Sequence, residues 1–410
     1  MTVTTQTWNY KARDPQGKLI KGRVEAPSES SAVARMRTMG LSPVTVSVAA
    51  GGSGLNREIS LGVFDKGVTL KDLAVMSRQL ATMVAAGIAL LRALTILADQ
   101  TESKSLARSL GTVRSQVESG SSLSEALARQ PDVFPPLMIH LVKAGETGGF
   151  LDQALESIAA TFEADVKLRS TIKSALTYPV VVLLMAVVAV IGMLVFIVPI
   201  FEKMFADLGG ELPLPTQILV VLSRSMIWVG PLLIILGVAF AIWWRGNKHN
   251  DGVRAFVDPI KLKLPVFGDL IRKVSIARFT RNFATMTKSG VPVLQSLSIV
   301  GDTSGNWVIR EALYDVQDSV RSGRSIAEPL AASGVFPPMV TQMIAVGEDA
   351  GSMEQMLNKI ADFYEDEVQT TTEALTSLIE PLMIGFIGVV IGGMIVALYL
   401  PIFTIFEQIN

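Results

Sequence analysis

The chain has 410 residues, of which 50% are hydrophobic and only 18% are charged. Soluble globular domains carry about 25% charged residues, so this deficit predicts membrane segments rather than one large soluble core. The formal net charge of −1 gives no global basic field for nucleic acid, and the absence of cysteine excludes disulfides and thiolate metal sites.

Residues 1–50 are predicted to form a small α/β domain. The expected elements are strands over Thr7–Arg13, Leu19–Ala26 and Leu41–Val48, with a turn at Pro15-Gln16-Gly17 and a helix over Ser28–Met39. Gly40 is expected to end that helix. The glycine- and serine-containing residues 51–65 indicate a linker. The N-terminus lacks the apolar core of a signal peptide, so we expect this domain to remain in the cytoplasm.

The C-terminal half of the chain repeats the N-terminal half. Arg78–Asp99 aligns with Arg281–Asp302 at an offset of 203 residues, and Phe134–Val166 aligns with Phe336–Val368 at an offset of 202. Such a unit is far longer than a solenoid repeat of about 20–50 residues. We interpret it as a duplicated module. Apolar residues spaced three or four apart predict a helical domain in each copy, over residues 66–173 and 265–376.

A helix stop followed by a capping box occurs at equivalent positions in both copies. Gly120 precedes the box with Ser122 and Glu125, and Gly323 precedes the box with Ser325 and Glu328. Serine and glutamate at this spacing satisfy the unpaired amides of a helix start. We therefore assign structural roles to these two serines and two glutamates.

Three apolar stretches are long enough to cross a bilayer core of about 30 Å. The expected spans are residues 174–201, 217–244 and 379–406, with a short loop over 202–216 between the first two. The first and third spans are bracketed by prolines, which are Pro179 and Pro199 in one and Pro381 and Pro401 in the other. Lys and Arg gather before the first span and after the second. Cationic flanks face the cytoplasm, so we expect both helical domains inside and the loop and C-terminus outside.

Two features of the spans leave alternatives open. Arg224 lies near the outer end of the second span, where it is expected either to reach the headgroups or to pair inside an oligomer. Gly388 and Gly392 form a G-x-x-x-G pattern, which is a weak signal for close packing of membrane helices.

Most searches for catalytic motifs fail. The sequence has no G-x-x-x-x-G-K-[ST] phosphate loop, no G-x-G-x-x-G and no H-E-x-x-H. Its two histidines, His140 and His249, are too few for a His-rich metal site. We expect a protein that is not an enzyme and binds no cofactor.

Glu146 and Glu348 are the most distinctive polar residues, because each lies in a G-E-x-x-G turn of its copy. One interpretation is helix initiation, in which the carboxylate accepts backbone N–H bonds at a helix start. The other is contact with a partner protein or a divalent cation, with Asp99, Asp152 and Glu354 as possible further oxygen ligands. The remaining candidates for a partner interface are Gly145, Gly149, Gly347, Gly351, Glu365, Asp366 and Glu367.

These motifs together resemble the inner-membrane platform family of type II secretion systems and type IV pili (GspF/PilC). The resemblance rests on Tyr10-Lys-Ala-Arg-Asp-Pro-Gln-Gly17, on Ile172-x-x-Ala175-Leu176-x-Tyr178-Pro179 and on the paired F-P-P and G-E-x-x-G elements. Thr171 departs from the usual basic residue or Gln, and Glu380 replaces the Tyr before Pro381.

The resemblance covers nearly the whole chain and implies a mainly α protein with about six helices per cytoplasmic bundle. It implies a non-catalytic platform in the bacterial inner membrane. The implied partners are a cytoplasmic ring ATPase, pilin or pseudopilin subunits, other inner-membrane assembly proteins and further copies of the same chain. It does not distinguish secretion from pilus assembly.

Two other classes of function remain as alternatives. A transporter or channel would need oligomerisation to form a pore, and ionisable residues inside the membrane usually mark its path. A receptor would need an external sensing surface, whereas the loop over residues 202–216 is short.

Overall fold

The computed structural model describes residues 6–13, 19–38, 40, 42–48, 67–207, 212–248 and 250–409. The chain divides into two compact units, Met1–Asp65 and Lys66–Asn410. The expected turn at Pro15-Gln16-Gly17, the linker over residues 51–65 and His249 lie outside the described residues.

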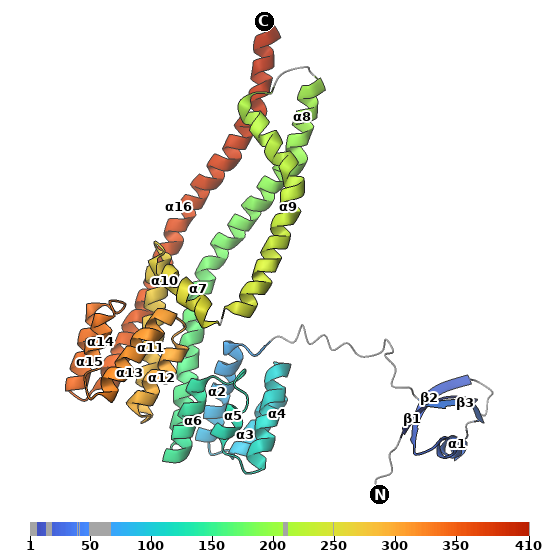
Figure 1. The fold of residues 1–410 in the computed structure, drawn as a ribbon, viewed down its shortest axis with the longest axis vertical. Coiled ribbons are helices and arrows are strands. Elements are labelled where there is room, and N and C mark those ends of the chain that lie inside the picture. The colour runs from blue at the N-terminus through green and yellow to red at the C-terminus, as the bar shows by residue number, and fades with distance from the viewer. Residues whose placement is uncertain are drawn as a thin grey trace. The chain divides into compact units, whose positions relative to one another are not determined.

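The N-terminal unit is a three-stranded antiparallel sheet with one helix (Figure 1). Its elements are β1 (Gln6–Arg13), β2 (Leu19–Ala26), α1 (Glu29–Thr38) and β3 (Ser42–Val48). The strand order is β2-β1-β3, so β1 is central and pairs with both neighbours. Val24, Ala26 and Ala32 are buried together between sheet and helix.

Each repeat of the second unit forms a bundle of helices. In copy one these are α2 (Leu70–Ala85), α3 (Leu90–Gln100), α4 (Lys104–Glu118), α5 (Leu123–Ala128), α6 (Pro136–Gly148) and the first part of α7 (Leu151–Gly192). In copy two they are α11 (Phe267–Lys288), α12 (Val293–Thr303), α13 (Trp307–Arg321), α14 (Ala327–Ala332), α15 (Pro338–Asp349) and the first part of α16 (Met353–Ile409). The order of helices is the same in both copies, which is what the sequence duplication predicts.

The two bundles pack against each other and share one apolar core, which includes Leu80 and Phe134 of copy one and Phe283 and Phe336 of copy two. Polar contacts also cross between them. The hydroxyls of Thr161 and Thr285 are 3.0 Å apart and buried. Gln295 Nε2 lies 2.9 Å from His140 Nδ1, and Arg278 Nε lies 2.7 Å from the Asp165 carboxylate.

No break separates bundle from span in either copy. α7 continues through the first apolar stretch to a single π-helical turn, η1 (Met193–Ile197), and then to α8 (Val198–Asp207). α16 runs through the third stretch in the same way. The expected divisions at residues 173/174 and 376/379 are therefore points within continuous helices, because no glycine stop precedes the apolar residues. Among the described residues, three helices are long and apolar enough to cross a membrane.

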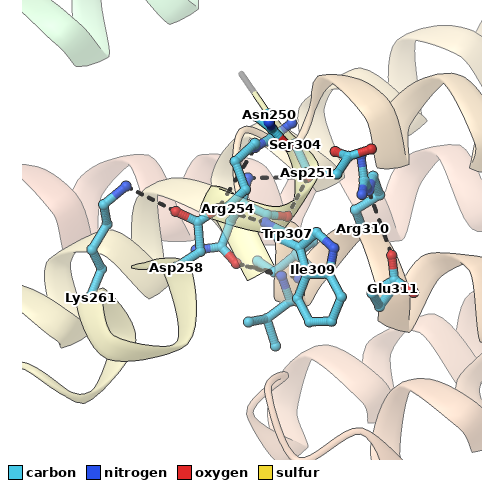
Figure 2. A network of polar contacts seen from close by, with 12 residues as sticks. Asn250, Asp251, Arg254, Asp258, Lys261, Ser304, Trp307, Ile309, Arg310 and Glu311 are labelled. Carbon is cyan, nitrogen blue, oxygen red and sulfur yellow. Dashed lines mark hydrogen bonds and ion pairs between the residues drawn. The ribbon is translucent and has the colours of Figure 1, made fainter. Parts of the chain in front are cut away.

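The second span is α9 (Leu214–Asn247). After it comes α10 (Asp251–Lys263), a helix between the second span and the second bundle that the sequence pattern did not predict. Figure 2 shows α10 held on the start of α13. The buried Asp258 carboxylate accepts the Trp307 amide at 2.9 Å and pairs with Lys261 at 2.9 Å. Arg310 reaches back to Asp251 at 2.8 Å, so α10, which follows α9 in the chain, is tied to copy two through polar contacts.

Candidate functional site

Glu146 and Glu348 perform the same task in the two copies. The Glu146 carboxylate accepts the amides of Leu123 and Ser124 at 2.6 and 3.1 Å. The Glu348 carboxylate accepts the Ile326 amide at 2.9 Å and the Ala327 amide at 3.4 Å. Each glutamate therefore caps the start of the helix that precedes its own helix, where amides lack intrahelical partners and the dipole favours negative charge.

This geometry corrects the position that we expected for both residues. They do not start a helix, since Glu146 lies in the last turn of α6 and Glu348 in the last turn of α15. The separation between capping box and glutamate is nearly the same in both copies. That constant separation in the sequence was the signal that could have revealed the contact.

The capping boxes complete the same helix starts. In copy one the Ser122 hydroxyl accepts the Glu125 amide and the Glu125 carboxylate accepts the Ser122 amide. In copy two the Ser325 hydroxyl accepts the Glu328 amide at 3.2 Å, while the reciprocal bond is not formed and α14 begins only at Ala327. The predicted box is thus complete in copy one and half formed in copy two.

The glycines of the G-E-x-x-G elements serve packing and helix termination. A Cβ on Gly145 would lie 2.7 Å from Ala154 Cβ, and one on Gly347 would lie 3.1 Å from Met356 Cβ. Both glycines are buried within the chain. Gly149 and Gly351 have φ of 75° and 64°, which glycine adopts without strain at a helix end.

A charged cluster that the sequence pattern did not predict lies between the first and last helices of each bundle. Arg78 donates to Glu163 at 2.7 and 2.6 Å and also contacts Glu156. At the equivalent place in copy two, Arg281 donates to Glu365 at 2.9 Å and to Asn358 at 3.2 Å, and contacts Asp362. The two arginines aligned in the sequence, but nothing in the pattern indicated which carboxylates they would meet.

These contacts shift the pKa values of Glu163 and Arg281. The hydrogen bonds from Arg78 hold the pKa of Glu163 below its ordinary value, although burial opposes them. For Arg281, burial lowers the pKa, but the bonds to Glu365 and Asp362 outweigh it and raise the pKa. A bidentate guanidinium–carboxylate pair fixes orientation as well as charge, so each clamp holds the membrane-bound helix against its bundle.

The acidic residues of α16 are largely engaged within the chain. Glu365 pairs with Arg281, and Glu367 pairs with Lys273 at 2.9 Å. Asp366 is exposed on the same helix. Of the three predicted interface residues, Asp366 is therefore the one that forms no ion pair with a described residue.

The oxygen ligands proposed for a divalent cation are not gathered. Within the described parts of the chain, no three Asp, Glu or His residues are close enough to hold a metal ion. Asp99 is exposed at the end of α3, and the Glu146 and Glu348 carboxylates are occupied by backbone amides.

The spans meet in a small apolar cluster formed by Leu194, Val198, Val220, Met394 and Leu398. Two buried hydroxyls of α9 tie the cluster together. The Ser223 hydroxyl donates to the Leu194 carbonyl at 2.5 Å, and the Thr216 hydroxyl donates to the Ala397 carbonyl. α9 therefore bonds to both duplicated spans.

Prolines explain why these two carbonyls are free. Pro401 has no N–H, so the carbonyl of Ala397 four residues earlier loses its helical partner. In the π-helical turn the spacing is five, as Val198 N–H bonds to Met193, and Pro199 therefore leaves Leu194 free. Neighbouring hydroxyls commonly satisfy such carbonyls in membranes. The four prolines that we expected to bracket the spans all lie inside helices.

The two open alternatives for the spans have different outcomes. Arg224 pairs with Glu202 of its own chain, across the loop between the first two spans. A Cβ added at Gly388 or Gly392 would meet nothing within 4 Å among the described residues, so the G-x-x-x-G face packs against no helix of this chain.

Comparison with known proteins agrees with the duplication. The family model for type II secretion system protein F matches residues 76–199 and again residues 279–401. The model for the N-terminal domain of that protein matches residues 3–47. The two larger matches begin 203 residues apart and end 202 residues apart, as do the aligned segments of the sequence.

Individual relatives match over almost the full length. Type IV pilus assembly protein PilC of Myxococcus xanthus is 42% identical over 403 residues, covering 98% of this chain and 95% of the relative. PilC of Thermus thermophilus is 41% identical over 404 residues, covering 98% and 99%. Type II secretion system protein F of Pseudomonas aeruginosa is 34% identical over 406 residues, covering 98% and 99%. The chain belongs to the type II secretion system protein F family.

Proposed function

We propose that this chain is the inner-membrane platform of a type IV pilus or type II secretion machine. In this role it couples a cytoplasmic assembly ATPase to the insertion or extraction of pilin or pseudopilin subunits, without catalysis of its own. The observation that carries the proposal is the continuity of α7 and α16, each of which runs unbroken from a helical bundle into an apolar span.

A continuous helix transmits rotation and tilt from one end to the other, provided that its base is held firmly. The Arg78 and Arg281 clamps and the capping by Glu146 and Glu348 fix each bundle around its long helix. Movement imposed on a bundle by a partner would then reach the membrane through the same helix. Both copies supply such a path.

The client side of the proposal rests on the exposed surface of the spans. Large apolar residues on all three spans face outward, for example Leu184 at 64%, Ile234 at 69% and Val389 at 77% exposure. A pilin or pseudopilin subunit is the client proposed for these apolar faces. We place both bundles and the N-terminal unit in the cytoplasm, and the loop between α8 and α9 and the C-terminus outside.

Partner coupling is tested with the purified full-length chain and the assembly ATPase of the same host. We expect the two to co-purify and the chain alone to hydrolyse no ATP. Hydrolysis by the chain alone, or loss of the chain with no effect on pili or secretion, would overturn the proposal.

Mechanical continuity is tested by a matched pair of variants in α16. Ser377 and Leu378 are exposed between bundle and span. Replacing both with glycine weakens the helix by about 1 kcal/mol per residue relative to alanine. We expect the glycine pair to reduce pilus assembly or secretion at unchanged protein level and ATPase binding, and the alanine pair to retain function. Equal function of the two variants would contradict transmission through α16.

A further inference from the structure

An open groove of about 940 Å³ lies among α2, α7 and α16. Its lining combines apolar residues such as Val75 with the cations Lys71 and Lys167, and with the hydroxyls of Ser170, Ser174 and Thr372. The wall therefore comes from both repeats, with two helices of copy one and one of copy two.

The groove lies at the depth where α7 enters its apolar span. Lys173 is the last charged residue before the span, and the next 28 residues contain no charged residue. Ser174 at the upper rim is thus the first residue of the span, and Lys167 lies about 10 Å lower along the helix at about 1.5 Å per residue. The headgroup layer of one leaflet occupies roughly 5–7 Å next to the hydrocarbon core, so Ser170, about 6 Å below Ser174, lies beside the headgroups. The Lys167 backbone lies a few Å beyond that layer, and a long lysine side chain can extend from there toward the headgroups.

The charges of the groove favour an anion. Arg78 is already paired with Glu163 and Glu156 in its clamp, and Glu373 accepts a bond from Gln369. Lys71 and Lys167 form no ion pair with any described residue. The five charged groups in the lining sum to one net positive charge.

The lysines are not a requirement of the bundle fold. At the same repeat offsets, Lys71 corresponds to Val274 and Lys167 to Gln369 in copy two. The second bundle forms the same order of helices without them. A basic pair confined to copy one therefore points to a task that only this copy performs.

We propose that this groove binds the headgroup of an anionic phospholipid of the cytoplasmic leaflet. The inference takes from the proposed function only the orientation of the bundles. Basic pockets between membrane helices on the cytoplasmic side bind such headgroups. Lys71 and Lys167 provide ammonium donors for the phosphate, Ser170 and Ser174 provide hydroxyl donors, and Val75 provides an apolar contact. A bound lipid would join the two repeats where they enter the membrane.

The test is native mass spectrometry of the full-length chain in detergent, titrated with phosphatidylglycerol, cardiolipin or phosphatidylethanolamine. The variant is Lys71→Gln with Lys167→Gln. The matched control is Lys104→Gln with Lys359→Gln, which removes the same charge at exposed positions outside the groove lining. Thermal unfolding without added lipid checks that both variants fold.

We expect the unaltered chain and the control to bind both anionic lipids more tightly than phosphatidylethanolamine. We expect the groove variant to bind them on the order of thirtyfold more weakly, since each of the two lysines near an anionic surface contributes about fivefold in affinity. Equal binding of anionic and zwitterionic lipid, or an equal loss in the control, would overturn the proposal.

Two further arms identify the occupant. Inorganic phosphate at the same concentration is expected not to displace the lipid, and displacement would identify a free-anion site instead. Since the chain has no native cysteine, Val75→Cys labelled with a photoreactive benzophenone reports the neighbour in membranes. A lipid adduct is expected, and a protein adduct in its place would contradict the assignment.

The lipid-binding proposal and the proposed platform function can be contradicted independently of each other. Equal binding of all lipids would remove the groove site and leave the ATPase and α16 experiments intact. Equal function of the glycine and alanine variants of α16 would count against the platform mechanism and leave lipid binding intact.

Discussion

At the scale of single residues, the paired glutamates connect helices that are separated in the chain. Glu146 and Ser122 together satisfy the first three amides of α5. Glu348 and Ser325 do the same for residues 326–328 at the start of α14. A six-residue helix has little intrinsic stability in water, so these caps and the buried apolar side chains hold it in place.

We expect Glu146→Ala to lower the free energy of unfolding by about 1–2 kcal/mol, because two amides of a helix start lose their acceptor. The measurement is thermal or denaturant unfolding of the purified chain. Asp99→Ala serves as the control, since Asp99 is exposed, and a surface change of this kind stays within about 0.5 kcal/mol. Loss of ATPase binding by Glu146→Lys with unchanged stability would favour a partner interface over the cap.

At the scale of elements, α9 is the only one of the three spans without a copy in the duplication, and it bonds to both of the others. Each bond uses a carbonyl that a proline releases. The prolines of the first and third spans thus create acceptors for the second span. These prolines therefore promote association of the three spans and do not end the helices that contain them.

We expect Thr216→Val to destabilise the assembled spans by roughly 0.6–1.7 kcal/mol, the range for hydrogen bonds between membrane helices. In a Pro401→Ala background the amide of residue 401 can satisfy the Ala397 carbonyl. Thr216→Val should therefore lower the free energy of unfolding by less in that background. A double-mutant cycle of unfolding in detergent measures the difference. Ser225→Ala, an exposed hydroxyl on α9, is the control. Additive effects of the two changes would contradict the coupling.

At the scale of the whole molecule, the second unit is one folded body in which the two repeats share a core. The contact between His140 and Gln295 lies at their junction. Burial lowers the pKa of His140, with a smaller contribution from Lys143. The folded state therefore favours the neutral imidazole.

This shift predicts a loss of stability in mild acid. The stability that depends on a neutral His140 is fully present above the ordinary histidine pKa of about 6.5. It decreases as the pH falls through that value toward the lower pKa of His140 in the folded state. His140 is only half-buried, so the effect is small. Between about pH 7.5 and about pH 5.5, we expect the unfolding temperature of the His140→Gln variant to fall less than that of the unaltered chain. Glutamine is chosen because Gln342 occupies the aligned position in copy two. Parallel curves of unfolding temperature against pH for the variant and the unaltered chain would contradict the prediction.

The proposed orientation predicts labelling from opposite sides of the membrane. Asp99, Asp207 and Asp349 are exposed and can be replaced singly by cysteine in this cysteine-free chain. In spheroplasts, we expect an impermeant maleimide to label Asp207→Cys and to reach the other two only after lysis. Labelling of either bundle position in intact spheroplasts would reverse the orientation.

The amino-acid sequence by itself determined the features that depend on local pattern. Helical periodicity, apolar length and the fixed offset between copies were enough to predict the bundles, the three spans and the duplication. The family was recognisable from the same residues, and the family-model matches confirm it.

Only the tertiary structure decided which groups meet. The partners of Arg78, the helix start capped by Glu146 and the carbonyl that Thr216 satisfies are each remote in sequence from the residue concerned. Periodicity places a residue on a helix face, but the facing helix depends on how the bundles pack. The groove at the membrane entry is of the same kind, because Lys71 and Lys167 line one groove only when α2 lies along α7.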